Sequence, residues 1–183
     1  RGWLDKLDIK NLFLFDQVEP NPSLETTQKI ISKFKNQAFS TVIGLGGGSS
    51  LDVAKFVAKE LNKTKIMIPT TFGSGSEVTR ISVLKVNNKK QSFHDDKLIS
   101  NIAITDSSFL DTTPTTILKN SAIDACAQCT EAFDSKNGNV YTKFFCKKAF
   151  DILESALQEK NYDDLAYGSL LAGIGFGNSS TTL

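Results

Sequence analysis

Residues 44–55, Gly-Leu-Gly-Gly-Gly-Ser-Ser-Leu-Asp-Val-Ala-Lys, decide the fold of this chain. An apolar run at residues 41–45 leads into the glycines, and a helical pattern follows them to Leu61. Glycines let a backbone approach a phosphate without interference from a Cβ atom, and a helix start presents N–H groups and partial positive charge to an anion. The stretch therefore predicts a buried strand, a phosphate-binding turn and a helix opened by Ser50 or Asp52. The alternative is an ordinary tight turn, for which three successive glycines are costly in conformational entropy.

A second polar loop, residues 69–79, reads Pro-Thr-Thr-Phe-Gly-Ser-Gly-Ser-Glu-Val-Thr and follows an apolar run at residues 65–69. Parallel sheets bind ligands at the carboxyl ends of their strands, where both loops would lie. For this loop alone, a turn capped by Ser and Thr hydroxyls is the simpler alternative. The first loop matches neither the P-loop, which needs Gly-Lys-Ser/Thr, nor the common dinucleotide pattern GxGxxG. Two such loops after two buried strands favour a site for the phosphates of a nucleotide.

Strand and helix patterns alternate as far as residue 111, and helical patterns alone follow. We therefore expect an α/β fold, with a parallel-sheet domain at residues 1–111 and the beginning of an all-helical domain at residues 112–183. The expected strands are residues 12–15, 41–45, 65–69, 81–86, 89–93 and 102–106, with a hairpin turn at Asn87 and Asn88. The expected helices are residues 24–36 after an N-cap at Ser23, the stretch from the glycines to Leu61, and residues 115–135, 140–159 and 163–177.

The ends of the chain and one internal link are unusual. The chain looks cut at both ends, because it begins on a helix-like piece without a preceding strand and ends within a helical region. The link between Asn62 and Lys65 is very short for a helix-to-strand connection, which suggests a missing surface loop there.

Composition excludes several classes of protein. The 183 residues include 21 basic and 20 acidic side chains, for a formal net charge of +1. No basic face is evident, so nucleic-acid binding has little support. No apolar run approaches the roughly 20 residues that a membrane span needs. The first residues lack the apolar stretch and cleavage site of a signal peptide. We expect a cytoplasmic protein without a membrane or nucleic-acid partner.

The cysteines and the histidine offer little chemistry. Cys126, Cys129 and Cys146 are an odd number without framework spacing, which points to a reducing compartment. Cys126 and Cys129 form a Cys-x-x-Cys, for which a zinc or redox site is one interpretation and two small residues on a helix the simpler one. The single histidine, His94, excludes a multi-histidine metal site within the chain and is expected on the solvated surface.

The two loops together resemble motifs of the iron-containing alcohol dehydrogenase family. The first is GGGSxxDxxK at residues 46–55, and the second is IPTTxGxGSEVT at residues 68–79. Residues 18–22, 124–131 and 171–178 are similar to further segments of the family, in the expected order, so the resemblance covers essentially the whole chain.

The resemblance implies an NAD(P)-dependent oxidoreductase whose cofactor and substrate bind in a cleft between an α/β domain and a helical domain. It implies that Gly47, Gly48 and Ser49 hold the cofactor pyrophosphate and that Asp52 lies beside the nicotinamide ribose or carboxamide. The other implied cofactor contacts are Thr70, Thr71, Ser74, Val83 and Lys90.

The resemblance also implies that Asp124 is a ligand for Fe²⁺ or Zn²⁺, but Gln128 stands where the family pattern has a histidine. The two positions are one helical turn apart, so both side chains can reach a single ion. A glutamine carbonyl is a poor substitute for imidazole with these metals. The family's other two metal histidines would lie beyond Leu183. Three interpretations stay open, namely weak metal binding through Asp124, Gln128 and unseen histidines, carbonyl reduction without a metal, or a divergent member with altered or lost activity.

The function implied is hydride transfer between NAD or NADP and a small alcohol, aldehyde or ketone. One alternative is a lyase or synthase of the dehydroquinate-synthase-like group, which uses NAD transiently, and another is a catalytically impaired nucleotide-binding member. No side chain stands out as a general base, so no catalytic residue is assigned, and the segment alone is expected to be inactive. A homodimer is the family expectation. The substrate and the choice between NAD and NADP depend on residues outside this sequence.

Overall fold

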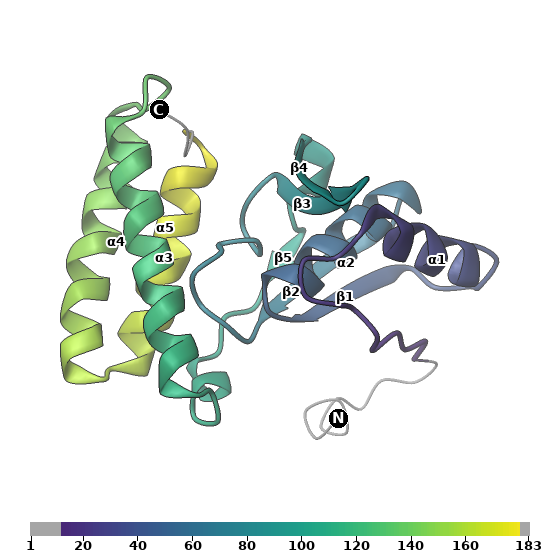
Figure 1. Ribbon diagram of the computed structural model, residues 1–183, viewed down its shortest axis with the longest axis horizontal. Coiled ribbons are helices and arrows are strands. Elements are labelled where there is room, and N and C mark those ends of the chain that lie inside the picture. Colours follow the sequence, from purple (N-terminus) through teal and green to yellow (C-terminus); the bar gives the residue numbers. More distant parts are fainter. Residues whose placement is uncertain (1–11, 180–183) are drawn as a thin grey trace.

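The computed structural model describes residues 12–179, and these residues form an α/β part followed by a bundle of three helices (Figure 1). The helices are α3 (Thr115–Asp134), α4 (Val140–Glu159) and α5 (Tyr162–Gly177), and each lies within one residue of its predicted bounds. The predicted fold class, a parallel sheet followed by helices, is confirmed. Within residues 12–179, no helix is long and apolar enough to cross a membrane.

The sheet of the α/β part is parallel and has the strand order β1-β2-β5. Its strands are β1 (Thr41–Gly46), β2 (Thr64–Pro69) and β5 (Ile102–Ala103). Helix α2 (Gly48–Glu60) crosses from β1 to β2 and packs closely on the sheet, because Gly44 has no side chain. A Cβ atom at Gly44 would lie 2.8 Å from the Cβ of Ala54 on α2. This crossover leaves the start of α2 at the carboxyl ends of the strands.

Helix α1 (Leu24–Phe34) follows a polar turn that caps it. The predicted N-cap is confirmed, because the hydroxyl of Ser23 accepts a hydrogen bond from the N–H of Thr26. Glu19 supports the cap by accepting bonds from the N–H of Ser23 (2.9 Å) and from the hydroxyl of Thr26 (2.8 Å). The side of α1 that carries Ile30 is buried against α2, which fixes α1 on the outside of the α/β part.

The predicted hairpin is confirmed as β3 (Ile81–Val86) and β4 (Lys89–His94), which pair antiparallel. Its two-residue turn places Asn87 at φ 51° and Asn88 at φ 63°. A type I′ turn requires a left-handed conformation at both of its central residues, and asparagine tolerates that conformation better than most residues. The hairpin is separate from the parallel sheet and lies beside α2.

Two predicted strands are corrected. Residues 12–15 form no strand, and the side chains of Leu12, Phe13 and Leu14 are each at least 40% exposed. A strand needs a partner for its backbone groups, and within residues 12–179 no strand pairs with this segment. The predicted strand at residues 102–106 is confirmed only at Ile102–Ala103, because Asp106 instead caps the short helix η3 (Ser107–Leu110).

The short link that suggested a missing loop is spanned by three residues. Helix α2 ends at Glu60 and β2 begins at Thr64. Asn62 takes a left-handed conformation (φ 52°), and the N–H of Lys63 donates to the carbonyl of Ala58 at 2.9 Å. This is the geometry of a Schellman helix stop, in which a left-handed residue closes the last turn. The connection is therefore stereochemically complete at this length.

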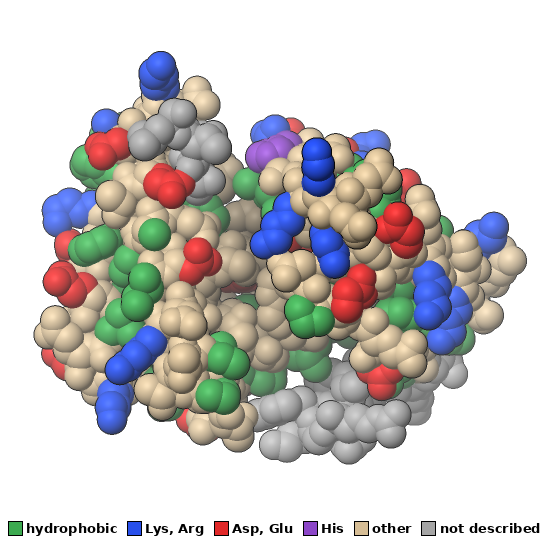
Figure 2. Space-filling view, viewed as in Figure 1, with side chains coloured by type: hydrophobic (Ala, Val, Ile, Leu, Met, Phe, Trp, Pro, Cys, Tyr) green, Lys and Arg blue, Asp and Glu red, His purple; other side chains and the backbone are tan. Residues whose placement is uncertain are grey.

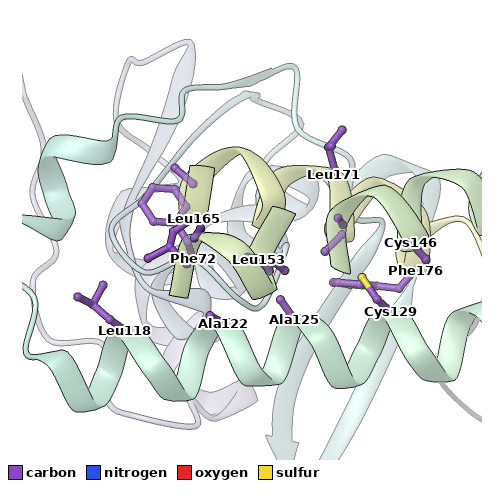
Figure 3. Close-up of a cluster of buried hydrophobic side chains, with 14 of the residues drawn as sticks. Phe72, Leu118, Ala122, Ala125, Cys129, Cys146, Leu153, Leu165, Leu171 and Phe176 are labelled. Carbon is purple, nitrogen blue, oxygen red and sulfur yellow. The ribbon is translucent and has the colours of Figure 1, made fainter. Parts of the chain in front are cut away.

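The apolar core lies in two main regions. One cluster, containing Ile30, Val53 and Leu84, joins α1, α2 and the hairpin. The larger cluster fills the helical bundle, and Phe72 from the second polar loop enters it beside Leu165 (Figure 3). The second loop is thereby anchored in the helical core rather than in the sheet that precedes it.

The turn before α1 makes stability depend on pH. Burial alone would raise the pKa of Glu19, but the hydrogen bonds from Ser23 and Thr26 outweigh it and lower the pKa from 4.5 to about 2. A carboxylate whose pKa is lowered on folding adds stability above pH 4.5, and this stability is lost as the pH falls toward 2. We expect Glu19→Gln to reduce the loss of unfolding free energy across this range, measured by urea unfolding at a series of pH values.

A matched variant separates the carboxylate from its surroundings. Thr26→Val removes the hydroxyl that donates to both carboxylate oxygens and should reproduce part of the effect. Parallel pH profiles for the unmodified protein and Glu19→Gln would contradict the prediction.

Candidate functional site

The two polar loops meet directly at the carboxyl ends of β1 and β2. A Cβ atom on Gly47 would lie 3.1 Å from the hydroxyl oxygen of Thr71. A Cβ atom on Gly48 would lie 2.8 Å from the hydroxyl oxygen of Ser74. Side chains at the two glycines would therefore fill the space between the loops. Four of the residues predicted for the cofactor site are thus brought together by the fold.

The start of α2 is suited to an anion. Gly47 is the N-cap, and among the described residues no side chain caps this end of the helix. The N–H groups of Ser50 and Leu51 donate to the carbonyl of Gly47 at 2.9 and 3.2 Å. The N–H groups of Gly48 and Ser49 have no acceptor within the helix, because the first turn of an α-helix offers none. These donors and the helix dipole favour a bound phosphate.

The predicted opening of α2 at Ser50 or Asp52 is wrong, because the helix begins at Gly48. Gly47 takes the extended conformation of an N-cap (φ −75°, ψ 177°) without needing a side-chain acceptor. Gly46 turns the chain out of β1 with φ 143°, a conformation that favours glycine. Helix α2 therefore begins only two residues after the last residue of β1, at the edge of the sheet.

Asp52 holds the site together from within α2. Its carboxylate accepts hydrogen bonds from the hydroxyl of Ser76 (2.6 Å) and from the N–H of Val83 (2.9 Å). It also lies 3.4 Å from the ammonium of Lys55. One aspartate therefore links α2 to the second loop and to the hairpin, and it brings Val83 to the site.

Of the remaining predicted cofactor residues, Thr70 and Ser49 lie at the first loop and Lys90 lies on the hairpin. Thr70 follows β2 and donates its N–H to the carbonyl of Gly46 at 3.0 Å, at the base of the first loop. The hydroxyl of Ser49 accepts a bond from the N–H of Asn21 at 3.3 Å, which brings the turn before α1 to the same edge. Lys90 lies farther out, exposed on β4 opposite Lys85. Figure 2 shows Lys and Arg side chains gathered on the α/β side of a recess between the two parts.

Two buried charged residues were not assigned a role from the sequence. Lys55 is completely buried, and its ammonium donates to the carbonyls of Thr79 (3.3 Å) and Ile81. Burial lowers the pKa of Lys55, while Asp52 opposes that shift. Glu77 is 2% exposed, burial raises its pKa, and its Oε1 has no hydrogen-bond partner among the described residues. The sequence places Lys55 one turn after Asp52 on the same helix, which predicts an ion pair between them but not the burial of the lysine.

The second loop packs tightly against the helical bundle. A Cβ atom at Gly73 would lie 2.4 Å from the carbonyl oxygen of Ser121 on α3. Gly75, at φ 58°, lies against Gly173 of α5, where a Cβ atom would approach the Cα to 2.6 Å. The loop that carries Thr71 and Ser74 is therefore held between α2 on one side and α3 and α5 on the other.

The predicted metal pair lies on α3, as expected. Asp124 and Gln128 share one face, and the amide nitrogen of Gln128 donates to the carboxylate of Asp124 at 2.8 Å. Within residues 12–179, no group of three or more His, Cys, Asp or Glu side chains is arranged to hold a metal ion. One carboxylate already bonded to an amide donor does not fit a transition-metal site by itself.

The cysteines lie on α3 and α4, and the histidine lies on the hairpin opposite Ile81. Cys126 and Cys129 are free thiols on α3, and Cys129 is buried against Cys146 of α4. A hydrogen bond between these two thiols raises the pKa of Cys129 and lowers the pKa of Cys146. His94 ends β4 and is exposed, which confirms it as a surface residue.

A parallel sheet joined to a helical bundle, with an uncapped helix start at the carboxyl ends of its strands, defines the fold class of this chain as α/β. The chain belongs to the iron-containing alcohol dehydrogenase family, whose family model, described as "Iron-containing alcohol dehydrogenase", matches residues 3–107. The resemblance carried by residues 46–55 and 68–79 is thereby confirmed.

Individual relatives agree with this assignment. The chain is 33% identical to long-chain-alcohol dehydrogenase 1 of Geobacillus thermodenitrificans, over 92% of the chain and 50% of that protein. It is 34% identical to 4-hydroxybutyrate dehydrogenase of Clostridium kluyveri, over 86% of the chain and 50% of that protein. An iron-containing alcohol dehydrogenase of Thermotoga maritima superposes with a TM-score of 0.87 at 26% identity, over 97% of the chain and 55% of that structure. The chain spans about half the length of the curated relatives it matches.

The contact between the second loop and α3 predicts a stability effect. Gly73→Ala should lower the free energy of unfolding by about 1–3 kcal/mol, because the new Cβ would meet the Ser121 carbonyl and force a backbone shift. Urea unfolding followed by circular dichroism measures the change. Ser74→Ala, which only removes an atom from the same loop, is the control and should change stability much less. Equal free energies of unfolding for Gly73→Ala and the unmodified protein would contradict the prediction, because they would show that the backbone at Ser121 can shift without loss of stability.

Proposed function

We propose that this chain forms the cofactor-binding half of an NAD(P)-dependent oxidoreductase that interconverts an alcohol and an aldehyde or ketone by hydride transfer. The observation that carries the proposal is the uncapped, glycine-lined start of α2 beneath the hydroxyls of Thr71 and Ser74. Its N–H donors from Gly48 and Ser49, which have no acceptor in the helix, suit a pyrophosphate. The named activities of the relatives support an alcohol or its carbonyl product as the substrate class.

The residues of the two loops bind and orient the cofactor. Gly47 and Gly48 let the pyrophosphate approach the backbone, and the hydroxyls of Ser49, Thr71 and Ser74 are donors around it. The bound nicotinamide supplies the hydride acceptor or donor. A site that holds both reactants in fixed geometry lowers the entropic part of the barrier.

The other predicted contacts lie around this centre. Thr70 lines the nucleotide pocket, and Val83 and Lys90 contact the cofactor from the hairpin. Asp52 lies beside the nicotinamide ribose or carboxamide, and its carboxylate also accepts the bonds from Ser76 and Val83. Its bonds hold the aspartate in one position, so it can orient a cofactor group without rearranging.

The two parts of the chain would have different roles in binding. We assign cofactor binding to an α/β domain at residues 1–111 and assign residues 112–183 to the beginning of a helical metal- and substrate-binding domain. The recess between the two parts would receive a small alcohol or aldehyde (Figure 2). A homodimer in the cytoplasm completes the proposal, which includes no membrane or nucleic-acid partner.

The described residues do not by themselves form a transition-metal site. Asp124 would be the acidic ligand, but Gln128 gives its amide N–H to that carboxylate rather than an imidazole nitrogen to an ion.

The cofactor assignment has a direct test at Gly48. Gly48→Val should abolish NADH and NADPH binding in the intact protein, because its side chain would occupy the space between α2 and Ser74. Gly48→Ala should weaken binding less, because a single methyl group fills less of the space beside the Ser74 side chain than an isopropyl group does. Cofactor fluorescence titration measures both affinities, and circular dichroism checks that the variants are folded. Unchanged affinity in folded Gly48→Val would contradict the assignment.

Turnover distinguishes this activity from its alternatives. A dehydrogenase gives net NADH or NADPH production from an alcohol, whereas a lyase or synthase that uses NAD transiently gives none. Cofactor binding without turnover across a broad panel of alcohols and aldehydes would identify a catalytically impaired member.

Gln128 gives a prediction about metal content. The intact protein should purify with less than one equivalent of iron or zinc, and Gln128→His should raise that content, because imidazole is the better ligand for both metals. Elemental analysis measures the content of both proteins. Ala127→His is the matched control, because it adds an imidazole at the neighbouring exposed position of α3, about 100° around the helix from Gln128. A full equivalent of metal in the unmodified protein would show that Gln128 does not impair binding.

A further inference from the structure

The ammonium of Lys55 is the most completely buried charge in the described part of the chain. Its side chain is fully buried on α2, one turn after Asp52. Three acceptors surround it, namely the carbonyl oxygens of Thr79 and Ile81 and a carboxylate oxygen of Asp52. A lysine ammonium has three N–H donors, so each acceptor can take one. Glu77 receives none of these bonds, and its Oε1 has no partner among residues 12–179.

The partners of Lys55 lie at the point where the second loop becomes the hairpin. Thr79 ends the loop, and Ile81 begins β3. Asp52 reaches the same stretch from the other side, through Ser76 and the N–H of Val83. Together, Asp52 and Lys55 fasten residues 76–83 to the helix whose first turn forms the proposed pyrophosphate site.

This arrangement makes the identity of residue 55 important. An apolar side chain would leave two buried carbonyls without a donor and Asp52 without its counter-charge. Breaking a buried pair by removing one partner is strongly unfavourable, because the remaining charge is left uncompensated. Residues 76–83 could relieve this cost by moving away from α2, and Val83, a proposed cofactor contact that is bonded to Asp52, would move with them.

We propose that Lys55 is a positioning residue for cofactor binding. It touches no bound group itself, and it holds the second loop and the hairpin in register with the start of α2. The proposal rests on the function proposed above. It predicts that cofactor affinity depends on a lysine buried behind the site rather than in it.

The test compares two lysines on the same helix in the intact protein. Lys55→Met keeps the length of the side chain and removes its donors, and Lys59→Met is the matched control. Lys59 lies one turn farther along α2 and pairs at the surface with Asp95 (3.2 Å). Lys55→Met should raise the NADH dissociation constant by about tenfold or more. Lys59→Met should leave it unchanged.

Steady-state kinetics separates positioning from general damage. In Lys55→Met, the KM for the cofactor should rise, while kcat at saturating cofactor and the KM for the alcohol should change little. A loss of folded protein would instead lower all rates in proportion and leave every KM unchanged. Lys55→Arg retains the charge but has a planar head that cannot reach the same three acceptors in the same way, so it should show a smaller rise in KM.

Each outcome decides the question. A dissociation constant within twofold of the unmodified value in folded Lys55→Met overturns the proposal, as does an equal loss in Lys59→Met. If Lys55→Met does not fold, the cofactor affinity of folded Lys55→Arg decides: a weaker affinity supports positioning and an unchanged one overturns it. Absence of NADH and NADPH binding by the unmodified protein would refute the proposed function itself, and is therefore distinguishable from failure of the inference about Lys55.

Discussion

The close approach of two loops with no side chain between them is the constraint on which the site depends. Gly47 and Gly48 lie so near Thr71 and Ser74 that Cβ atoms would fill the gap. The gap exists because β1 and β2 are parallel neighbours, so both loops leave the sheet at the same edge. Helix α2 begins in this gap without a side-chain cap from the described residues, and its first N–H groups are left to an outside acceptor. Sheet topology and glycine placement are therefore two conditions of the proposed anion site.

The second loop is held in place by α2 on one side and by the helical bundle on the other. On one side, Asp52 and Lys55 attach it to α2 through buried polar bonds, which are strong because little water competes for them. On the other side, Phe72 enters the core of the helical bundle, and Gly73 and Gly75 let the backbone lie against α3 and α5. The loop is consequently part of the junction between the α/β part and the helices. A ligand bound to it would be sensitive to how the two parts sit together.

The helical part provides only an incomplete set of metal ligands among the described residues. Asp124 and Gln128 occupy the face of α3 that the family resemblance indicated, yet the amide is a hydrogen-bond donor to the carboxylate. A histidine at position 128 would offer a nitrogen lone pair to an ion, which the amide nitrogen of glutamine does not have available. The low metal content proposed for this protein therefore rests on the residue types at positions 124 and 128.

The sequence by itself determined the features that local patterns encode. The strand before the glycine run, the Asn87–Asn88 turn and the bounds of α4 follow from short-range stereochemistry and were predicted correctly. Only the tertiary structure decided the rest. Residues 12–15 have a strand-like pattern, but no described strand pairs with them, and pairing is a long-range property. Lysine is a residue type that is usually exposed, and the role of Lys55 appeared only when the fold placed Thr79 and Ile81 around it. Burial and partners depend on segments distant in the chain, which no local pattern specifies.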